Sequence, residues 1–301
     1  MRLGPLEAVH VPARGRRRAT PVVLVHGLGL GSWIWERDQQ ILAAAGLGSY
    51  AVDLPGHGAD AGNDVSLKEV ADALLEAVGT LQGVALVGHS LGGLVAQMVA
   101  VRAELASLVL VAPAPPGNVP FVPTAAGVRS LAPAVTALVS GSPLKVPFDS
   151  YLASTLHVLP EGERRAVYDR INPWPNRLLK DMVRHRPELD PGQITCPVLV
   201  TYGGQDRTLR VQTVRLVSDL YDAKCWRFDD LAHIPSIEPG GERHMQKVAA
   251  WIRRPAGRRI QEIDQFAPHE GVGDELRDAR RGGTRRRSLL HRGHRHGFED
   301  R

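Results

Sequence analysis

The residues Gly88-His89-Ser90-Leu91-Gly92-Gly93 decide the fold. They follow an apolar run at 84–87, typical of a buried strand, and they precede a small-residue segment at 94–102 with helical spacing. A serine on a sharp turn between strand and helix is forced into a strained backbone conformation that projects its hydroxyl away from the sheet. Glycines two residues before and after the serine leave room where side chains would clash. The stretch therefore predicts Ser90 as an exposed nucleophile.

Apolar strand segments alternate with helical segments on both sides of this turn. Strands are expected at 21–25, 50–54, 84–87, 108–111, 198–202 and 225–228. Helices are expected at 32–45, 66–81, 94–102, 210–221 and 242–252. This alternation, with its continuous apolar strands, predicts an α/β fold with a doubly wound, mostly parallel sheet.

A proline-rich segment interrupts the alternation. Eight prolines lie from Pro113 to Pro147 among short helical pieces, and the strand–helix order resumes only at residue 198. We therefore predict one α/β domain over residues 1–252, with an inserted helical lid at about 113–191.

The net charge is concentrated at one end of the chain. The 301 residues carry a formal net charge of +5. Residues 253–301 contain 13 Arg against 8 Asp plus Glu, so that residues 1–252 are formally neutral. Because aliphatic residues are scarce there, we expect a disordered Arg-, Gly- and His-rich tail with a short helix near 274–280. Nucleic acid is not an expected partner, because enzymes that act on nucleic acids usually spread basic residues over the surface of the folded domain.

The apolar segments and the two cysteines indicate where the protein is located in the cell and whether it binds a metal. No stretch is long and apolar enough for a membrane span, and the first residues lack a signal-peptide pattern, which favours a cytoplasmic location. Cys196 and Cys225 are the two cysteines, and we expect reduced, buried thiols. Their spacing fits no metal site, and no metal or organic cofactor is expected.

A serine nucleophile needs a base, and the base needs a carboxylate that orients it. His233 and Asp206 each follow a predicted strand, so both should lie at the carboxyl ends of parallel strands beside Ser90. Asp229 and Asp230 compete for the role of acid. His89 and His244 are the alternatives to His233 as base. His89 is expected instead to line or pack beside the sharp turn at Ser90 (the elbow), and His244 is expected at the surface of the closing helix.

The chemistry also needs two backbone N–H groups that stabilise a developing oxyanion. One is expected from Leu91, directly after the nucleophile, and the other from Leu28 in a glycine-rich loop. We expect His26 to brace that loop through hydrogen bonds and His57 to be structural.

Several side chains are candidates for lining a substrate pocket. Trp33 and His89 are the substrate-binding candidates in the α/β domain. The lid adds candidate specificity residues, namely Phe121, Phe148, Tyr151, Trp174 and Met182.

Five segments in this order resemble the α/β-hydrolase superfamily, of the lidded, serine-nucleophile esterase type. They are HGLGLGSW at 26–33, DLPGHG at 53–58, GHSLGG at 88–93, YGGQDRT at 202–208 and LAHIPSIEP at 231–239. The resemblance implies that Ser90 is the nucleophile, Asp206 the acid and His233 the base. It also implies that Leu28 and Leu91 are the oxyanion donors. One departure is Ala232, where the family usually has Gly before the catalytic His.

The resemblance implies a serine hydrolase that cleaves carboxylic esters or thioesters of a small acyl substrate through an acyl-enzyme. C–C bond hydrolysis, lactone opening, acyl transfer and perhydrolysis are alternatives on the same three residues. A non-catalytic binding protein on this scaffold is a further alternative.

Overall fold

The computed structural model describes residues 1–15, 20–121, 124–129 and 140–254. The chain divides into two units, Met1–Ile260 and Gln261–Arg301, and the second lies wholly outside the described residues. The predicted tail therefore falls outside the described part from residue 255 onward, and so does the short helix expected near 274–280.

One eight-stranded sheet organises the first unit, in the order β1-β2-β4-β3-β5-β6-β7-β8. Neighbouring strands from β4 to β8 run parallel, whereas β1 and β2 are joined antiparallel at one edge. The strands are β1 (Arg2–Leu3), β2 (Leu6–Val11), β3 (Val22–Val25), β4 (Ser49–Val52), β5 (Ala85–His89), β6 (Ser107–Val111), β7 (Val198–Gly203) and β8 (Lys224–Phe228). The predicted doubly wound, mostly parallel sheet is confirmed, and the edge pair β1–β2 is an addition that the sequence analysis missed.

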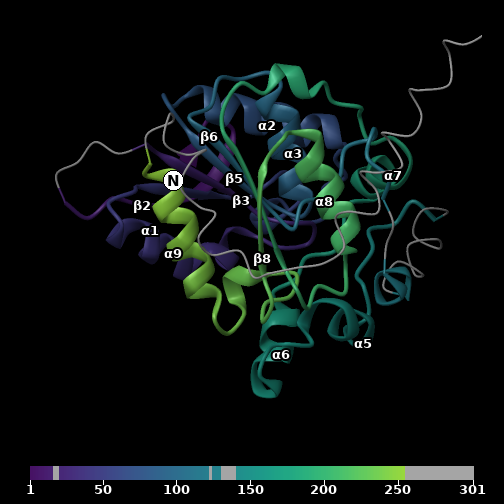
Figure 1. Ribbon diagram of the computed structural model, residues 1–301. Helices are drawn as coiled ribbons and strands as arrows, with labels where there is room; N and C mark the ends of the chain where they lie inside the picture. The colour runs from purple at the N-terminus through teal and green to yellow at the C-terminus, as the bar shows by residue number, and fades with distance from the viewer. Residues whose placement is uncertain (16–19, 122–123, 130–139, 255–301) are drawn as a thin grey trace, which may run out of the picture. The chain divides into compact units, whose positions relative to one another are not determined.

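Helices cover both faces of this sheet. The helices that flank the sheet are α1 (Glu36–Ala44), α2 (Leu67–Gly79), α3 (Leu91–Ala100), α8 (Val211–Leu220) and α9 (Gly241–Ile252). Three further helices, α5 (Phe148–Tyr151), α6 (Glu161–Asp169) and α7 (Asn176–Arg184), lie between β6 and β7 in the chain. Figure 1 shows α1 and α9 together on one side of the sheet and α2, α3 and α8 on the other. Within the described ranges, no helix combines the length and apolarity needed to cross a membrane. The cytoplasmic location stays a prediction.

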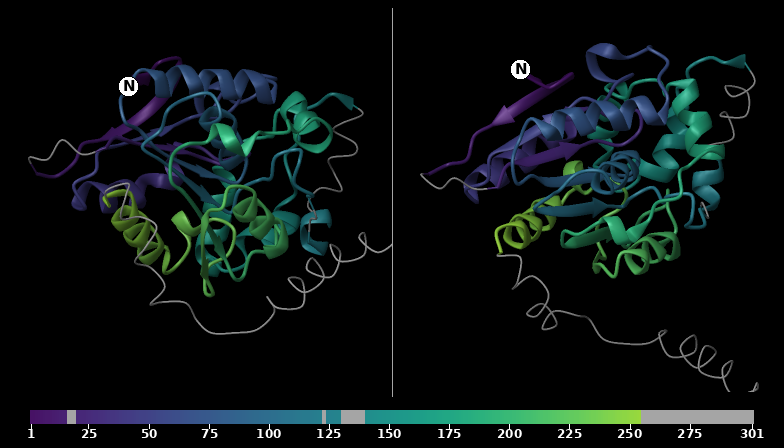
Figure 2. Two further views of the ribbon diagram at one scale, coloured as in Figure 1. Left: turned by 45° about the horizontal axis from the view of Figure 1, so that its top comes forward. Right: turned by 90° about the horizontal axis from the view of Figure 1, so that it is seen from above.

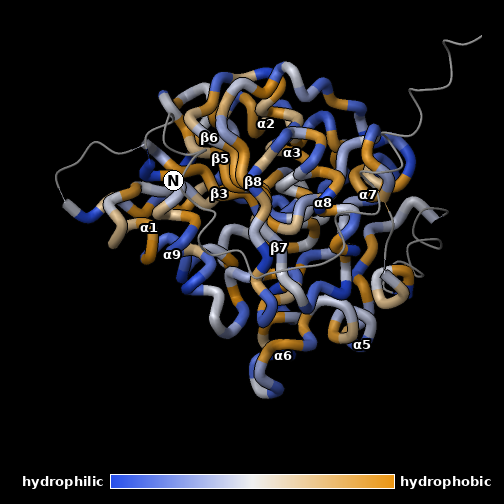
Figure 3. The backbone as a smooth tube through the Cα atoms, in the orientation of Figure 1, coloured by the Kyte–Doolittle hydropathy of each residue, from blue (hydrophilic) through white to orange (hydrophobic). Residues whose placement is uncertain are grey.

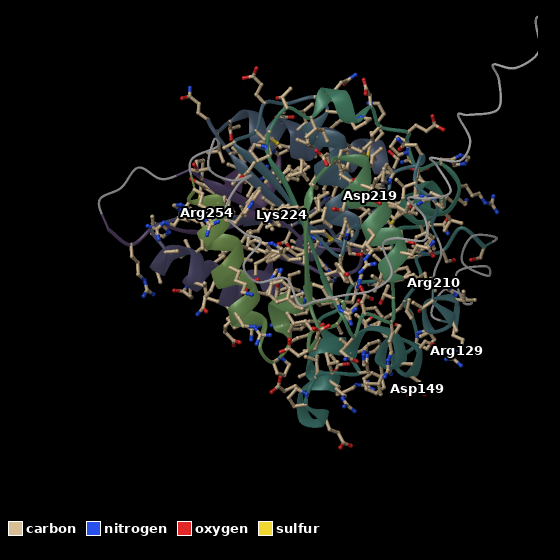
Figure 4. The ribbon with its side chains drawn as sticks, viewed as in Figure 1. Arg129, Asp149, Arg210, Asp219, Lys224 and Arg254 are labelled. Atoms are coloured by element: carbon tan, nitrogen blue, oxygen red, sulfur yellow. The ribbon has the colours of Figure 1, made fainter. Side chains whose placement is uncertain are left out.

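Burial explains why the central strands are continuous apolar runs. Every residue of β3, β5 and β6 is buried, because helices cover both faces. Figure 3 shows these strands as hydrophobic stretches at the centre of the sheet. Charged side chains such as Arg129, Asp149 and Asp219 lie exposed at the periphery (Figure 4). The α/β body thus separates an apolar interior from a surface that carries both signs of charge.

Local signals set the start of α2 as expected. The Ser66 side chain accepts a hydrogen bond from the Glu69 amide, and the Glu69 carboxylate accepts one from the Ser66 amide at 2.7 Å. This capping box satisfies two of the N–H groups that every helix start leaves unpaired.

A long connection between the neighbouring strands β6 and β7 carries α5, α6 and α7. The predicted lid at 113–191 falls within this connection. Figure 2 shows its teal helices gathered away from the purple N-terminal strands. The connection departs from the short strand–helix alternation of the rest of the sheet, which is what its prolines indicated.

Two expectations about buried and exposed side chains are wrong. His244 is fully buried rather than at the surface, because it lies on the inner face of α9, where its Nε2 contacts the Thr201 hydroxyl at 2.9 Å. Cys225 is exposed rather than buried, because β8 is the outermost strand of the sheet. Cys196 is half-buried, and neither cysteine forms a disulfide bond within the described residues.

Candidate active site

Ser90 occupies the turn between β5 and α3 in a strained conformation, with φ of 52° and ψ of −116°. A Cβ on Gly88 would lie 2.3 Å from the Gly92 carbonyl oxygen, and a Cβ on Gly92 would lie 2.4 Å from the His26 carbonyl oxygen. No larger residue fits either position without moving backbone. The two glycines therefore let strand and helix approach closely enough to form the elbow.

The structure brings Ser90, His233 and Asp206 together from three separate loops. The Ser90 hydroxyl lies 3.1 Å from His233 Nε2, and His233 Nδ1 lies 2.8 Å from Asp206 Oδ2. The other Asp206 oxygen accepts hydrogen bonds from the amides of Thr208 at 2.7 Å and Leu209 at 3.0 Å. Those amides fix the carboxylate, which in turn fixes the tautomer of His233 with Nδ1 protonated and Nε2 facing the serine.

The competing carboxylates point elsewhere. Asp229 pairs with Arg227 at 2.5 Å, and Asp230 pairs with Arg243 at 2.6 Å. Both are exposed surface pairs. Neither reaches His233, so Asp206 is the acidic partner of the imidazole.

Opposing effects act on the pKa of His233. Burial, the largest of them, lowers that pKa by disfavouring the imidazolium. The charge of Asp206, its hydrogen bond and the charge of Glu238 together outweigh burial, so that the pKa is raised above the ordinary value of 6.5.

Glu238 is a feature of this site that the sequence analysis missed. Its side chain is 1% exposed, and its two oxygens accept hydrogen bonds from the amides of Ala232 at 2.6 Å and Ile234 at 2.7 Å. Burial raises the pKa of Glu238 to about 7, against the effect of the two amides. The signal in the sequence was one acidic residue within the otherwise uncharged, largely apolar stretch at 234–239.

Ala232 fits where the family usually has Gly. Among the described residues, positive φ at a residue other than Gly occurs only at Ser90, Ala112 and Asp222. The tight approach falls instead on Gly203, where an added Cβ would lie 2.1 Å from the Ala232 carbonyl oxygen. The methyl group of Ala232 is therefore accommodated without backbone strain.

The loop after β3 is braced by two neutral histidines. His57 Nε2 accepts a hydrogen bond from the Gly29 amide at 3.0 Å, and His26 Nε2 accepts one from the Leu54 amide at 3.0 Å. Burial is the main cause that lowers the pKa of His26 to about 4 and that of His57 to about 3. Both therefore act as the structural supports that were expected.

The predicted oxyanion donors come from two segments, Leu91 from the start of α3 and Leu28 from the loop after β3. Leu91 is the first residue of α3, where helix amides have no partner within the helix. Within the described part of the chain, neither the Leu91 amide nor the Leu28 amide donates a hydrogen bond. Leu28 also lines the cavity beside Ser90. Both groups are thus free to donate to a bound molecule.

A cavity of about 120 Å³ opens beside Ser90 and His233. Its walls are mainly apolar and come largely from the β6–β7 connection, including Phe121, Trp174 and Met182. Tyr151 also lines it and is 6% exposed, and its hydroxyl has no hydrogen-bond partner among the described residues. An apolar cavity with few polar groups is the usual form of a small-molecule site.

The two substrate-binding candidates of the α/β domain have different places. His89 lines the cavity, and its Nε2–H donates to the His233 carbonyl oxygen at 2.8 Å, while the two rings lie 5.0 Å apart. Trp33 is not among the described lining residues, and the Arg170 guanidinium lies over its ring at 4.3 Å. His89 thus packs beside His233 at the cavity, whereas Trp33 contacts Arg170 and does not line the cavity within the described residues.

A mostly parallel sheet with a strained serine at a strand-to-helix turn is the arrangement of α/β-fold hydrolases. A model described as the alpha/beta hydrolase family matches residues 22–251, and the chain belongs to that family. The predicted class, an enzyme with the α/β-hydrolase fold, is confirmed.

Several relatives are named as esterases or lipases. Over 231 residues, the chain is 31% identical to a pimeloyl-acyl-carrier-protein methyl ester esterase of Vibrio cholerae, covering 71% of this chain and 87% of that protein. It is 28% identical over 252 residues to a monoacylglycerol lipase of Mycolicibacterium smegmatis, covering 77% and 87%. The solved monoacylglycerol lipase of Paleococcus ferrophilus has a TM-score of 0.61 and 26% identity, covering 82% of this chain and 98% of its own. These similarities support ester hydrolysis as the activity class.

Proposed function

We propose that this protein hydrolyses carboxylic esters or thioesters of a small acyl substrate, with Ser90 as nucleophile, His233 as general base and Asp206 as the acid. The observation that carries the proposal is the continuous contact from the Ser90 hydroxyl through the imidazole to a buried carboxylate, at 3.1 Å and 2.8 Å. A strained nucleophile, a positioned base and a carboxylate that orients the base are the three parts that acyl transfer to serine needs.

The first half of the reaction forms an acyl-enzyme. His233 Nε2 takes the proton as Ser90 Oγ attacks the acyl carbon, and negative charge develops on the former carbonyl oxygen. The amides of Leu28 and Leu91 stabilise that oxyanion, and losing one such donor typically costs about 3–4 kcal/mol. His233 then protonates the leaving alcohol or thiol. Asp206 stabilises the imidazolium throughout.

The second half releases the acid. A water molecule enters where the leaving group was, and His233 takes one of its protons as the oxygen attacks the acyl-enzyme. Collapse of the second tetrahedral intermediate returns the proton from His233 to Ser90.

We propose that the segment 113–191 acts as a lid, on the evidence of those of its residues that the structure describes. The Asn172 amide donates a hydrogen bond to the Gly29 carbonyl oxygen at 2.7 Å, which joins the connection to the loop that carries Leu28. Trp174 and Leu179 of the same connection line the cavity. These contacts support our proposal that the segment holds the acyl group and excludes water from the oxyanion.

A fluorophosphonate probe tests the proposal directly. Wild-type protein should be labelled at Ser90 and should hydrolyse p-nitrophenyl esters. Ser90→Ala should lose the label and lower kcat on the order of 10⁶-fold. Ser142→Ala, at an exposed serine, is the matched control and should keep both properties. Labelling that persists in Ser90→Ala would overturn the proposal, and an added alcohol acceptor separates hydrolysis from acyl transfer.

A further inference from the structure

Arg186 is the permanently charged side chain among the described residues that line the cavity beside Ser90. The rest of that lining is apolar or neutral at ordinary pH, His233 apart, because burial lowers the pKa of His89 well below its ordinary value. A guanidinium at an apolar wall gives up part of its hydration, and burial accordingly lowers the pKa of Arg186. Such a placement calls for a compensating partner.

The backbone that carries Arg186 is fixed against the loop that follows β6. The Gly117 amide donates to the Pro187 carbonyl oxygen at 2.7 Å, and a Cβ on Gly117 would lie 2.3 Å from the Arg186 carbonyl oxygen. Asn118 both donates to and accepts from Leu189, at 3.0 Å and 3.3 Å. Arg186 is thus held at the cavity by its backbone, not merely by its flexible side chain.

No carboxylate in the described part of the chain pairs with Arg186. Its guanidinium donates to the Pro115 carbonyl oxygen at 3.3 Å and lies 5.4 Å from the Phe121 ring centre. One donor of the five is paired in this way. By contrast, Arg170 and Arg177 of the same connection bond to the carboxylates of, respectively, Glu36 at 3.1 Å and Glu69 at 3.2 Å.

The guanidinium lies within reach of the nucleophile's turn. Pro115 directly follows Ala114, whose amide donates to the Ser90 carbonyl oxygen at 2.9 Å. Standard backbone dimensions then place the Arg186 nitrogen at most about 13 Å from that oxygen. One substrate molecule of moderate length can therefore touch both ends.

We propose that this cavity takes an ester that also carries a carboxylate, and that Arg186 binds the carboxylate. The inference rests on the proposed ester hydrolysis at Ser90. The apolar wall would bury the chain between the two groups, and the planar guanidinium can bind a carboxylate through two parallel hydrogen bonds. The carboxylate supplies the negative partner that the described chain does not.

Paired substrates test this selectivity and show on which side the carboxylate belongs. For the acyl side, mono-p-nitrophenyl suberate is compared with p-nitrophenyl octanoate. For the alcohol side, 4-carboxyphenyl hexanoate is compared with phenyl hexanoate. Wild-type protein should have a higher kcat/KM for the carboxylated member of one pair, by about 10- to 100-fold, the usual range for a hydrogen bond to a charged group. Added salt should reduce that ratio.

Variants assign the selectivity to one side chain. Arg186→Met should lower the ratio of carboxylated to neutral kcat/KM by about the same 10- to 100-fold, and Arg186→Lys should keep part of it. Arg184→Met removes the same charge from an exposed position two residues away and should leave both activities and their ratio unchanged. If Arg186→Met does not fold, the Arg186→Lys ratio and the salt dependence carry the test.

The outcomes separate this inference from the proposed function. A wild-type ratio near one in both pairs overturns the inference, while labelling of Ser90 and turnover of neutral esters still support ester hydrolysis. A ratio that Arg186→Met leaves unchanged, or that Arg184→Met lowers equally, overturns it too. Failure of Ser90 labelling, together with no turnover of any ester, removes the proposed function and the inference with it.

Discussion

Glu238 accepts a 2.6 Å hydrogen bond from the amide of Ala232, the residue directly before His233. Its second oxygen accepts a 2.7 Å bond from the amide of Ile234, directly after that histidine. One buried side chain therefore fixes the backbone on both sides of the imidazole. His233 is thus positioned by two carboxylates, Asp206 through its ring and Glu238 through its backbone.

Replacing Glu238 should impair the base without weakening substrate binding. In Glu238→Gln the amide oxygen can accept from one of the two backbone N–H groups, but the NH2 group faces the other donor. An unsatisfied buried donor costs about 1–3 kcal/mol of stability, so the backbone beside His233 should shift. Because a small misplacement of a reacting group can cost up to about 10²-fold in rate, we expect kcat to fall by up to that factor while KM changes little. Steady-state kinetics measure both.

The variant should also change the pH profile of kcat/KM. The charge of Glu238 helps to raise the pKa of His233. The acidic limb of the kcat/KM profile should therefore move to lower pH in Glu238→Gln. Glu242→Gln, at an exposed carboxylate paired with Arg37, is the control and should behave like wild type. An unchanged profile with a lowered melting temperature would assign Glu238 a purely structural role.

Asp206 should influence the acidic limb of the kcat/KM profile more strongly than Glu238 does. His233 must be neutral to act as a base, and its raised pKa predicts an acidic limb of kcat/KM above pH 6.5 in wild-type protein. In Asp206→Asn the raising effect disappears, so the limb should move to lower pH while kcat falls on the order of 10⁴-fold. Asp229→Asn tests the rival acid and should leave both unchanged. A comparable loss in Asp229→Asn would contradict the assignment of Asp206.

Elements with local signals could be predicted from the sequence. The run at 22–25 is apolar because both faces of β3 are covered, and Ser66 with Glu69 caps α2 within four residues of chain. The elbow at Ser90 is equally local, since its glycines make the turn that they signal. Each of these features depends on neighbours in sequence, which is why residue patterns identified them.

Features that depend on distant partners could not be predicted in this way. His244 is buried because Thr201, 43 residues away, contacts it across the α9–sheet interface. The pair β1–β2 carries alternating polar residues on a sheet edge and has no continuous apolar run. The cavity walls depend on how the β6–β7 connection folds back over Ser90, and periodicity alone does not encode that path.

Gly203 should tolerate no side chain, because the backbone of Leu231 and Ala232, which leads to His233, packs directly against it. In Gly203→Ala the new Cβ would meet the carbonyl oxygens of Ala232 at 2.1 Å and Leu231 at 2.3 Å, so backbone must move. We expect a loss of about 1–3 kcal/mol in the free energy of unfolding, together with reduced kcat as His233 shifts from Asp206.

The matched control for that substitution is Gly79→Ala. Gly79 ends α2, and a Cβ there would meet nothing within 4 Å. Alanine should stabilise the helix by up to about 1 kcal/mol. Urea unfolding and ester kinetics compare the two variants, and equal stability of Gly203→Ala and wild type would refute the packing argument.

Buried neutral histidines should make the fold sensitive to acid. Burial lowers the pKa of His244 to about 3 in the folded state, while an unfolded chain titrates near 6.5. Below pH 6.5 the unfolded state therefore binds a proton that the folded state rejects, and stability falls as the pH falls toward 3. His26 and His57 act in the same direction, because burial lowers their pKa values as well.

His244→Gln isolates one of these contributions. The glutamine amide can keep a hydrogen bond to Thr201 but cannot titrate, so the difference in unfolding free energy between pH 7.5 and pH 5 should shrink by about 2 kcal/mol. His10→Gln, at an exposed histidine, should leave that difference as in wild type. Denaturant unfolding at the two pH values measures it. A His244→Gln protein that loses as much stability on acidification as wild type would show that this histidine is already charged in the folded state.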